Sequence, residues 1–257
     1  MSLSERSLSV GVVIPAFDPD YELLSSYVQD LQAGVADVVH VELDAPDGPP
    51  AGALETPDSH TIVRRRRGKG QAITDGFDSL ETDVLAFADA DGATPSSSID
   101  AVVAPVRDGA VELSIGSRRH PASTIESHQT RFRRRLGDSF AWLARQLLPI
   151  SVYDYQCGAK ALTADAWEQI RPSITETGFA WDLELLGLAG QLGISHREVP
   201  VRWNDQPGST VDPLGATYEM GTALFAIRRR LNTIEPSVAD DEPIESNVSP
   251  TDSTGGD

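Results

Sequence analysis

The amino-acid sequence predicts an α/β protein with a mostly parallel sheet flanked by helices. Two observations lead to this prediction. Short apolar runs alternate with longer stretches in which apolar residues recur at helical spacing. Strands that alternate with helices in this way form βαβ units, which build a largely parallel sheet. With 257 residues, 40% of them apolar, the chain can bury a sizeable core.

The expected elements follow one another in a regular order. Short apolar runs predict strands at 8–14, 38–43, 61–63, 83–88, 111–116 and 198–203. Apolar faces at helical spacing, with serine as a good cap at the start of the third helix, predict helices at 21–31, 72–80, 96–107, about 130–147, near 164, 182–193 and 216–231. The first strand run stops at Pro15, and the fourth leads directly into the acidic residue Asp89.

The end of the chain differs from the rest. Residues 233–257 contain seven acidic residues and no basic or aromatic residue. Such a segment cannot bury enough apolar surface to offset the entropy lost on ordering. We therefore expect one catalytic domain over residues 1–232, followed by a disordered acidic tail.

Charge and composition exclude several classes of protein. The chain has 21 basic and 39 acidic residues, a net charge of −18, which argues against a nucleic-acid binder. One cysteine forms no internal disulfide, and five scattered histidines offer no zinc cluster. No stretch reaches the ~18–20 apolar residues that span a bilayer, and the first ten residues lack an apolar signal region. We expect a cytoplasmic protein, at the cytoplasmic face of a membrane if its substrate is a lipid.

The basic residues are almost all arginine, with Lys69 and Lys160 as the two exceptions. High acid content with few lysines suits a salt-rich cytoplasm, because molar salt screens charge repulsion within a few Å. We therefore hypothesise a halophilic protein. Unfolding below about molar salt would support this hypothesis, and full stability in dilute buffer would end it.

Acidic residues follow three of the expected strands: Asp18, Asp44, and Asp89 with Asp91. In open α/β sheets, ligands bind beyond the carboxyl ends of the strands. Carboxylates that converge there repel one another unless a cation lies between them, and a divalent cation on a pyrophosphate would satisfy this arrangement. Turns also favour aspartate in general, and for Asp18 this alternative is equally good. For Asp89-Ala90-Asp91 the turn preference is a weak explanation, because two acids on either side of one small residue directly follow an apolar strand.

Six motifs follow one another along the chain: Val12-Val-Ile-Pro-Ala-Phe-Asp18, Gly68-Lys-Gly70, Asp89-Ala-Asp91, Gly116-Ser-Arg118, Asp154-Tyr-Gln-Cys-Gly158 and Glu198-Val-Pro-Val-Arg-Trp203. In this order they resemble the family 2 glycosyltransferases of the GT-A (Rossmann-like) fold, in particular the dolichyl-phosphate mannose and glucose synthases. The resemblance covers about residues 8–212.

The resemblance implies roles for individual residues. Asp89 and Asp91 match the pair that holds Mg²⁺ or Mn²⁺ on the nucleotide diphosphate of the donor sugar. It implies a donor-binding set of Pro15, Phe17, Asp18, Asp44, Lys69, Asp89, Ala90, Asp91, Arg118, Arg202 and Ser209. Within it, Pro15 and Phe17 lie beside the base, Asp44 bonds the base or ribose, and Arg118 contacts the phosphates. Arg202 and Ser209 close over the donor.

The acceptor decides whether the reaction needs a base. A sugar hydroxyl needs a carboxylate to remove its proton, and Asp154, Asp182 and Glu184 are the candidates, with Asp154 preferred as a catalytic residue beside Asp91 and Arg118. A phosphate monoester is already dianionic near neutrality and needs cations instead. A basic cluster that could bind it consists of Arg131, Arg133, Arg134 and Arg135.

This cluster favours a phosphate-bearing acceptor over a hydroxyl. Together with the resemblance, it implies transfer of a hexose from a GDP- or UDP-sugar to a polyprenyl (dolichyl) phosphate, by an inverting, metal-dependent reaction. Two alternatives stay open: transfer to a sugar hydroxyl of a lipid-linked or soluble glycan, and a catalytically silent scaffold protein. A lipid acceptor would bring peripheral membrane contact. Amphipathic helices at about 131–148 and 216–231 could provide it, or their apolar faces could pack on the core. We expect Trp142, Trp167 and Trp181 to pack in the core.

Overall fold

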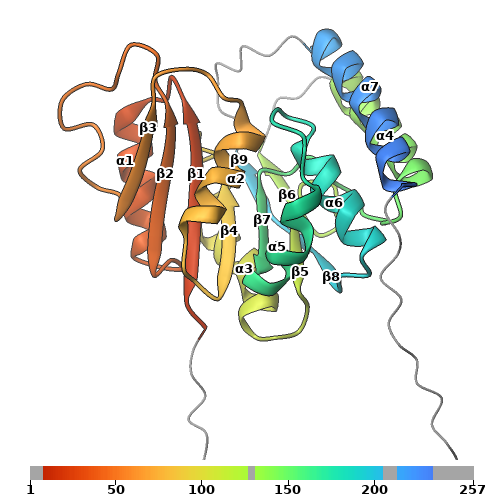
Figure 1. Ribbon diagram of the computed structural model, residues 1–257, viewed down its shortest axis with the longest axis horizontal. Coiled ribbons are helices and arrows are strands. Elements are labelled where there is room, and N and C mark those ends of the chain that lie inside the picture. Colours follow the sequence, from red (N-terminus) through yellow and green to blue (C-terminus); the bar gives the residue numbers. More distant parts are fainter. Residues whose placement is uncertain (1–7, 127–130, 205–212, 234–257) are drawn as a thin grey trace, which may run out of the picture.

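The computed structural model describes residues 8–126, 131–204 and 213–233 of the chain (Figure 1). Its centre is a seven-stranded sheet, which confirms the predicted fold class. From one edge to the other, the strands are β3 (Ser59–Val63), β2 (Val38–Asp44), β1 (Val10–Phe17), β4 (Val84–Ala88), β7 (Ala159–Thr163), β5 (Leu113–Ser117) and β8 (His196–Pro200). All neighbouring pairs are parallel except those of β7, which runs antiparallel to both β4 and β5.

Helices cover both faces of this sheet. One face packs against α1 (Tyr21–Gln32) and α3 (Ser96–Arg107). The other packs against α2 (Lys69–Ser79), α5 (Ala164–Ile170) and α6 (Trp181–Gln191), with α4 (Arg131–Leu147) and α7 (Pro213–Leu231) beyond α6 (Figure 1). A short 3₁₀ helix, Arg171–Ser173, follows α5. The apolar spacing that predicted the helices therefore supplies two cores, one on each side of the sheet.

Two features of the strands were not predicted. Strand β7 is short, and Lys160 interrupts its apolar character, so the sequence gives it no continuous apolar run. The expected strand at 198–203 is two strands: β8 ends at Pro200, and β9 (Arg202–Asn204) leaves the main sheet to pair with β6 (Thr124–Glu126). The chain thus turns out of the sheet between them.

The outer helices α4 and α7 lie side by side (Figure 1). Phe140, Leu224 and Leu231 are buried, so the apolar faces of both helices pack on the core. Trp142 was expected in the core, and this was wrong: it is 59% exposed, because it lies on the side of α4 that faces away from the core.

Trp167 and Trp181 are buried as expected. Among the described helices, none combines the length and the apolar character needed to cross a bilayer. Residues 234–257, which make up nearly all of the expected tail, lie outside the described part of the chain.

Candidate active site

The C-terminal ends of the parallel central strands lie together at one end of the sheet, which we call the edge of the site. Phe17 pairs with Asp44 at the ends of β1 and β2, and Ala88 at the end of β4 pairs with Ala159. Because β7 runs in the opposite direction, its beginning lies where its neighbours end. Residues after β4 and β5 therefore meet residues before β7, as the Asp89 N–H donating to the Gly158 carbonyl (3.1 Å) shows.

Asp89 is paired with the first residue of α2. Its Oδ1 lies 2.8 Å from Lys69 Nζ, and its side chain is 39% exposed. Helix α2 begins here because Gly68, at φ 102°, turns the chain into it. Burial alone would raise the pKa of Asp89, but Lys69 lowers it below its usual value. Burial would lower the pKa of Lys69, but Asp89 and Asp182 raise it, so both groups are charged.

Asp91 is exposed, and one of its oxygens accepts the N–H of Ala93 at 3.0 Å. Desolvation raises the pKa of Asp91, and the charge of Asp89 adds to this. Ala90, between the two acids, packs partly against the core. Within the described ranges, no ion pair is found for Asp91, so its carboxylate is open to an added cation.

A divalent cation fits this pair of carboxylates. Carboxylate oxygens suit hard cations such as Mg²⁺, which commonly keep several waters and bind protein through one or two carboxylates. Among the described residues, no group of three or more His, Cys, Asp or Glu side chains could form a closed metal cage. A cation here would therefore take its other ligands from water and a bound diphosphate.

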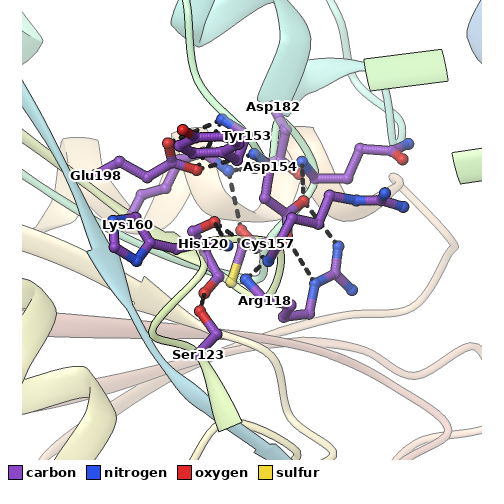
Figure 2. Close-up of polar contacts among 12 residues, drawn as sticks. Arg118, His120, Ser123, Tyr153, Asp154, Cys157, Lys160, Asp182 and Glu198 are labelled. Carbon is purple, nitrogen blue, oxygen red and sulfur yellow. Dashed lines mark hydrogen bonds and ion pairs between the residues drawn. The ribbon is translucent and has the colours of Figure 1, made fainter. Parts of the chain in front are cut away.

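Arg118 and Asp154 form a bidentate ion pair (Figure 2). Arg118 is near enough to Asp89 that its charge also lowers the pKa of that carboxyl. Arg118 Nε lies 2.7 Å from Asp154 Oδ2, its second nitrogen lies 3.0 Å from Oδ1, and its backbone N–H donates to Oδ2 at 3.1 Å. Asp154 is 1% exposed. Burial alone would raise the pKa of Asp154, but Arg118 holds it well below its usual range. Asp154 is therefore bound as the counter-ion of Arg118.

Glu198 on β8 fixes the segment that carries Asp154. Its carboxylate accepts the backbone N–H groups of Tyr153 and Asp154 at 2.8–2.9 Å (Figure 2). On the other side, the Arg118 guanidinium lies 5.8 Å from the centre of the Trp203 ring, so Trp203 borders the site. These contacts hold Arg118 at the end of β5.

The two other candidate bases are also paired. Asp182 Oδ1 lies 2.5 Å from the ammonium of Lys160, whose side chain is fully buried, and Asp182 Oδ2 lies 3.6 Å from Lys69. Glu184 points elsewhere, to Arg230 (2.7 Å) and to Thr175 (2.8 Å). As expected for positions i and i+2 of a helix, Asp182 and Glu184 point apart. The sequence reasoning missed Lys160; its scarcity, as one of two lysines, was the available signal.

Asp44 lies at the predicted strand end, but its oxygens are used within the protein. Oδ1 accepts Arg67 Nε at 2.7 Å, and Oδ2 accepts the backbone N–H groups of Arg67 (2.5 Å) and Gly68 (3.3 Å). Arg67 also bonds Glu42 and Asp75. This buried network fixes the loop that leads into α2, and thus the position of Lys69.

The remaining expected residues lie around the same edge or outside the described part. Phe17 is 46% exposed and has the Arg66 guanidinium 4.3 Å from its ring centre. Asp18 is exposed at φ 48°, a left-handed conformation that is uncommon outside glycine.

Pro15 is half-buried. Arg202 is exposed, and its backbone N–H donates to the Ser98 hydroxyl. Ser209 lies outside the described residues. Helix α4 begins with Arg131, Arg133, Arg134 and Arg135, and their side chains are likewise outside what the structure describes.

Comparison with known proteins identifies the family. No family model matches the chain. A dolichyl-phosphate β-glucosyltransferase of Drosophila melanogaster is 30% identical over 86% of this chain and 74% of its own length. Its mouse counterpart is 33% identical over 67% of this chain and 55% of its own length. Glycosyltransferase AglD of Haloferax volcanii is 29% identical over 90% of this chain, which spans 38% of AglD.

A solved structure supports the fold independently. Glucosyl-3-phosphoglycerate synthase from Mycobacterium tuberculosis, in complex with Mn²⁺, UDP-glucose and phosphoglyceric acid, superposes with a TM-score of 0.66. It is 16% identical, and the match covers 86% of this chain and 80% of that one. By its relatives and its architecture, the chain belongs to the family 2 glycosyltransferases of the GT-A fold.

Proposed function

We propose that the chain transfers a hexose from a nucleotide sugar to a polyprenyl phosphate. Glucose is the hexose we favour, because dolichyl-phosphate β-glucosyltransferases are among its relatives. UDP and GDP are both candidates for the nucleotide. One observation carries the choice of acceptor: the carboxylates of Asp154, Asp182 and Glu184 are each ion-paired with a lysine or arginine side chain.

This pairing favours a phosphate over a hydroxyl acceptor. A sugar hydroxyl must lose a proton to a carboxylate within hydrogen-bond reach. The three candidates are buried carboxylates that are each paired with a basic side chain instead. Protonating one of them would leave that basic side chain without its counter-ion, which is costly. A phosphate monoester, with a second pKa of about 6, is largely dianionic near neutrality and attacks without a base.

The reaction then needs no proton transfer. An oxygen of the acceptor phosphate bonds to the anomeric carbon, and the bond from that carbon to the donor diphosphate breaks. The bonding electrons leave with the nucleoside diphosphate, and direct displacement inverts the anomeric carbon. Arg118 and Lys69 place positive charge where the diphosphate leaves. Asp91 and Asp89 would hold Mg²⁺ or Mn²⁺, which when bound supplies further charge to the diphosphate.

The acceptor phosphate belongs, in this proposal, with the arginines at the start of α4. In the described part of α4, Asp138 pairs with Arg119, the residue after Arg118, and the Arg119 guanidinium packs over Gly137. These contacts tie α4 to the strand end that carries Arg118. The proposal therefore assigns Arg131, Arg133, Arg134 and Arg135 to the acceptor phosphate.

A polyprenyl acceptor also implies contact with a membrane, on its cytoplasmic face in this proposal. Trp142 on α4 is 59% exposed and Phe225 on α7 is 53% exposed, and the two helices are neighbours. Arg228 and Arg229 follow in the last turn of α7. Exposed aromatic side chains with nearby arginines suit an anionic bilayer surface.

The test is an assay of nucleoside diphosphate release. UDP-glucose and GDP-mannose are each offered with Mn²⁺ and either a polyprenyl phosphate or a sugar hydroxyl. We expect nucleoside diphosphate release with the polyprenyl phosphate and none with the sugar hydroxyl. In Asp91→Ala the turnover rate should fall about 100-fold or more. Asp108→Ala, which removes an exposed carboxylate just after α3, is the matched control. Turnover with the hydroxyl alone would contradict the proposed acceptor, and no turnover with any pair would favour the scaffold alternative.

A further inference from the structure

Four side chains of alternating charge run from the interior of the sheet to the candidate metal pair. Lys160 on β7 contacts Asp182 on α6 at 2.5 Å. The other oxygen of Asp182 lies 3.6 Å from Lys69, and Lys69 lies 2.8 Å from Asp89. Both lysines of the chain are in this row.

Lys160 depends on Asp182. Its side chain is fully buried, and it lies near the start of β7, where the strand pairs with β4 on one side and β5 on the other. Among the described residues, its other polar contact is the Cys157 carbonyl, at 2.9 Å, and its ammonium lies 5.5 Å from the centre of the Phe87 ring. A buried ammonium without a carboxylate is strongly unfavourable. Lys160 therefore fixes Asp182 as a charged group that faces Lys69.

Lys69 is consequently held between two carboxylates. It is closer to Asp89 than to Asp182, since Lys160 already neutralises part of the charge of Asp182. A divalent cation on Asp89 and Asp91 would lie within a few Å of the Lys69 ammonium and would be repelled by it. Binding of the cation therefore favours movement of Lys69 toward Asp182 or toward a diphosphate.

We propose that Asp182 and Lys160 are positioning residues that keep Lys69 at Asp89, so that Lys69 competes with the divalent cation. The inference rests on the metal site of the proposed function. It predicts that the cation alone binds weakly. A nucleoside diphosphate strengthens its binding, because the phosphates accept the displaced ammonium.

Lys160→Met tests the inference, because it removes the charge that keeps Asp182 from attracting Lys69. Lys69 then moves toward Asp182 and releases Asp89. We expect the affinity for Mn²⁺ in the absence of nucleotide to rise about tenfold. This is the order of magnitude for moving the Lys69 ammonium a few Å away from the bound cation at an effective dielectric constant of about 20. The measurement is titration calorimetry without nucleotide, and thermal unfolding shows that each variant is folded.

A double-mutant cycle with Lys69→Met separates this mechanism from a direct effect of the Lys160 charge. Lys69→Met alone should also raise the Mn²⁺ affinity. In that background, Lys160→Met should change the affinity by less than about threefold. An equal effect of Lys160→Met with and without Lys69 would overturn the inference and leave the proposed function intact.

The double variant Lys160→Met/Asp182→Asn provides a second test in case Lys160→Met does not fold. It removes both buried charges together, so neither is left without its partner. Lys69 then has Asp89 as its remaining carboxylate among these four residues, and the Mn²⁺ affinity should equal that of the unmodified chain or fall below it. A gain in affinity would overturn the inference. If the unmodified chain bound no Mn²⁺ even with a nucleoside diphosphate, the metal site would fail, and the inference with it.

Discussion

Gly158 is the residue against which the Asp89 carboxylate packs. A Cβ built on Gly158 would lie 1.8 Å from Asp89 Oδ2, far closer than any real contact. Glycine is therefore required here to let the carboxylate rest on the backbone. The position was part of a sequence motif, but its reason appears only in the structure.

We predict that Gly158→Ala displaces the Asp89 carboxylate and lowers kcat/KM about 100-fold, as for a misplacement of about 1 Å at a catalytic site. The measurement is donor turnover alongside thermal unfolding. Gly221→Ala is the control, because a Cβ there meets nothing within 4 Å. Full activity of Gly158→Ala would show that Asp89 need not stay where it lies.

The ion pair of Asp154 predicts a pH dependence of stability. Its pKa in the folded chain is depressed by Arg118, against an ordinary value of about 3.9 when unfolded. The pair thus contributes stability that is fully present above about pH 4 and is lost as the pH falls toward the folded pKa. We expect Asp154→Asn to be less stable at pH 7 and to lose less stability between pH 5 and 3, by urea unfolding. Parallel pH curves would contradict this.

Individual residues show the limits of the sequence argument. Strand ends placed Asp89, Asp91 and Arg118 at one edge, as predicted, because the carboxyl ends of parallel strands meet there. The sequence did not predict that Asp44 would be bonded to Arg67, or that Lys160 would be the partner of Asp182. Each pair joins residues more than 20 positions apart, and no local pattern reports such a contact.

At the scale of elements, helices were easier to predict than strands. Most helices have an apolar face at regular spacing, whereas α6 is buried on all sides from Trp181 to Ala189. Helix α3 spans the expected 96–107, although its N-cap is Pro95 and not the expected serine. The five-residue β7 gave no signal because a charged residue, Lys160, is its second residue and breaks the apolar run. The charge is tolerated because α6 supplies Asp182. Trp142 was misplaced for the converse reason, since its size suggested burial while its position on α4 faces outward.

The exposed aromatic residues of α4 and α7 predict membrane binding. Trp142→Ala and Phe225→Ala should each weaken binding to anionic vesicles about tenfold, because burial of one large apolar side chain contributes about 1.5–3 kcal/mol. Co-sedimentation with vesicles measures this. Ile62→Ala, on the edge strand β3, is the control. Unchanged sedimentation of all three variants would exclude these helices as the contact.

Across the whole molecule, acidic charge dominates. The net charge of −18 produces mutual repulsion that extends over about 10 Å at 0.1 M salt and about 3 Å at 1 M. We predict that the Tm rises by about 5–10 °C between 0.1 and 3 M KCl, equivalent to about 2–3 kcal/mol for a chain of this length. Scanning calorimetry measures it, with sucrose of matched viscosity as the control for solvent effects. A constant Tm would end the hypothesis of salt adaptation.

Strand β7 also restricts how the molecule can open. Its two neighbours, β4 and β5, belong to the parts of the sheet that end in Asp89 and in Arg118, and it is hydrogen-bonded to both. Pulling these parts away from each other would break two ladders at once, so the sheet behaves as one rigid plate. Entry of the proposed polyprenyl phosphate and exit of the nucleotide would therefore rely on movement of loops and of the outer helices, while the spacing between the acidic pair and the arginine stays constant.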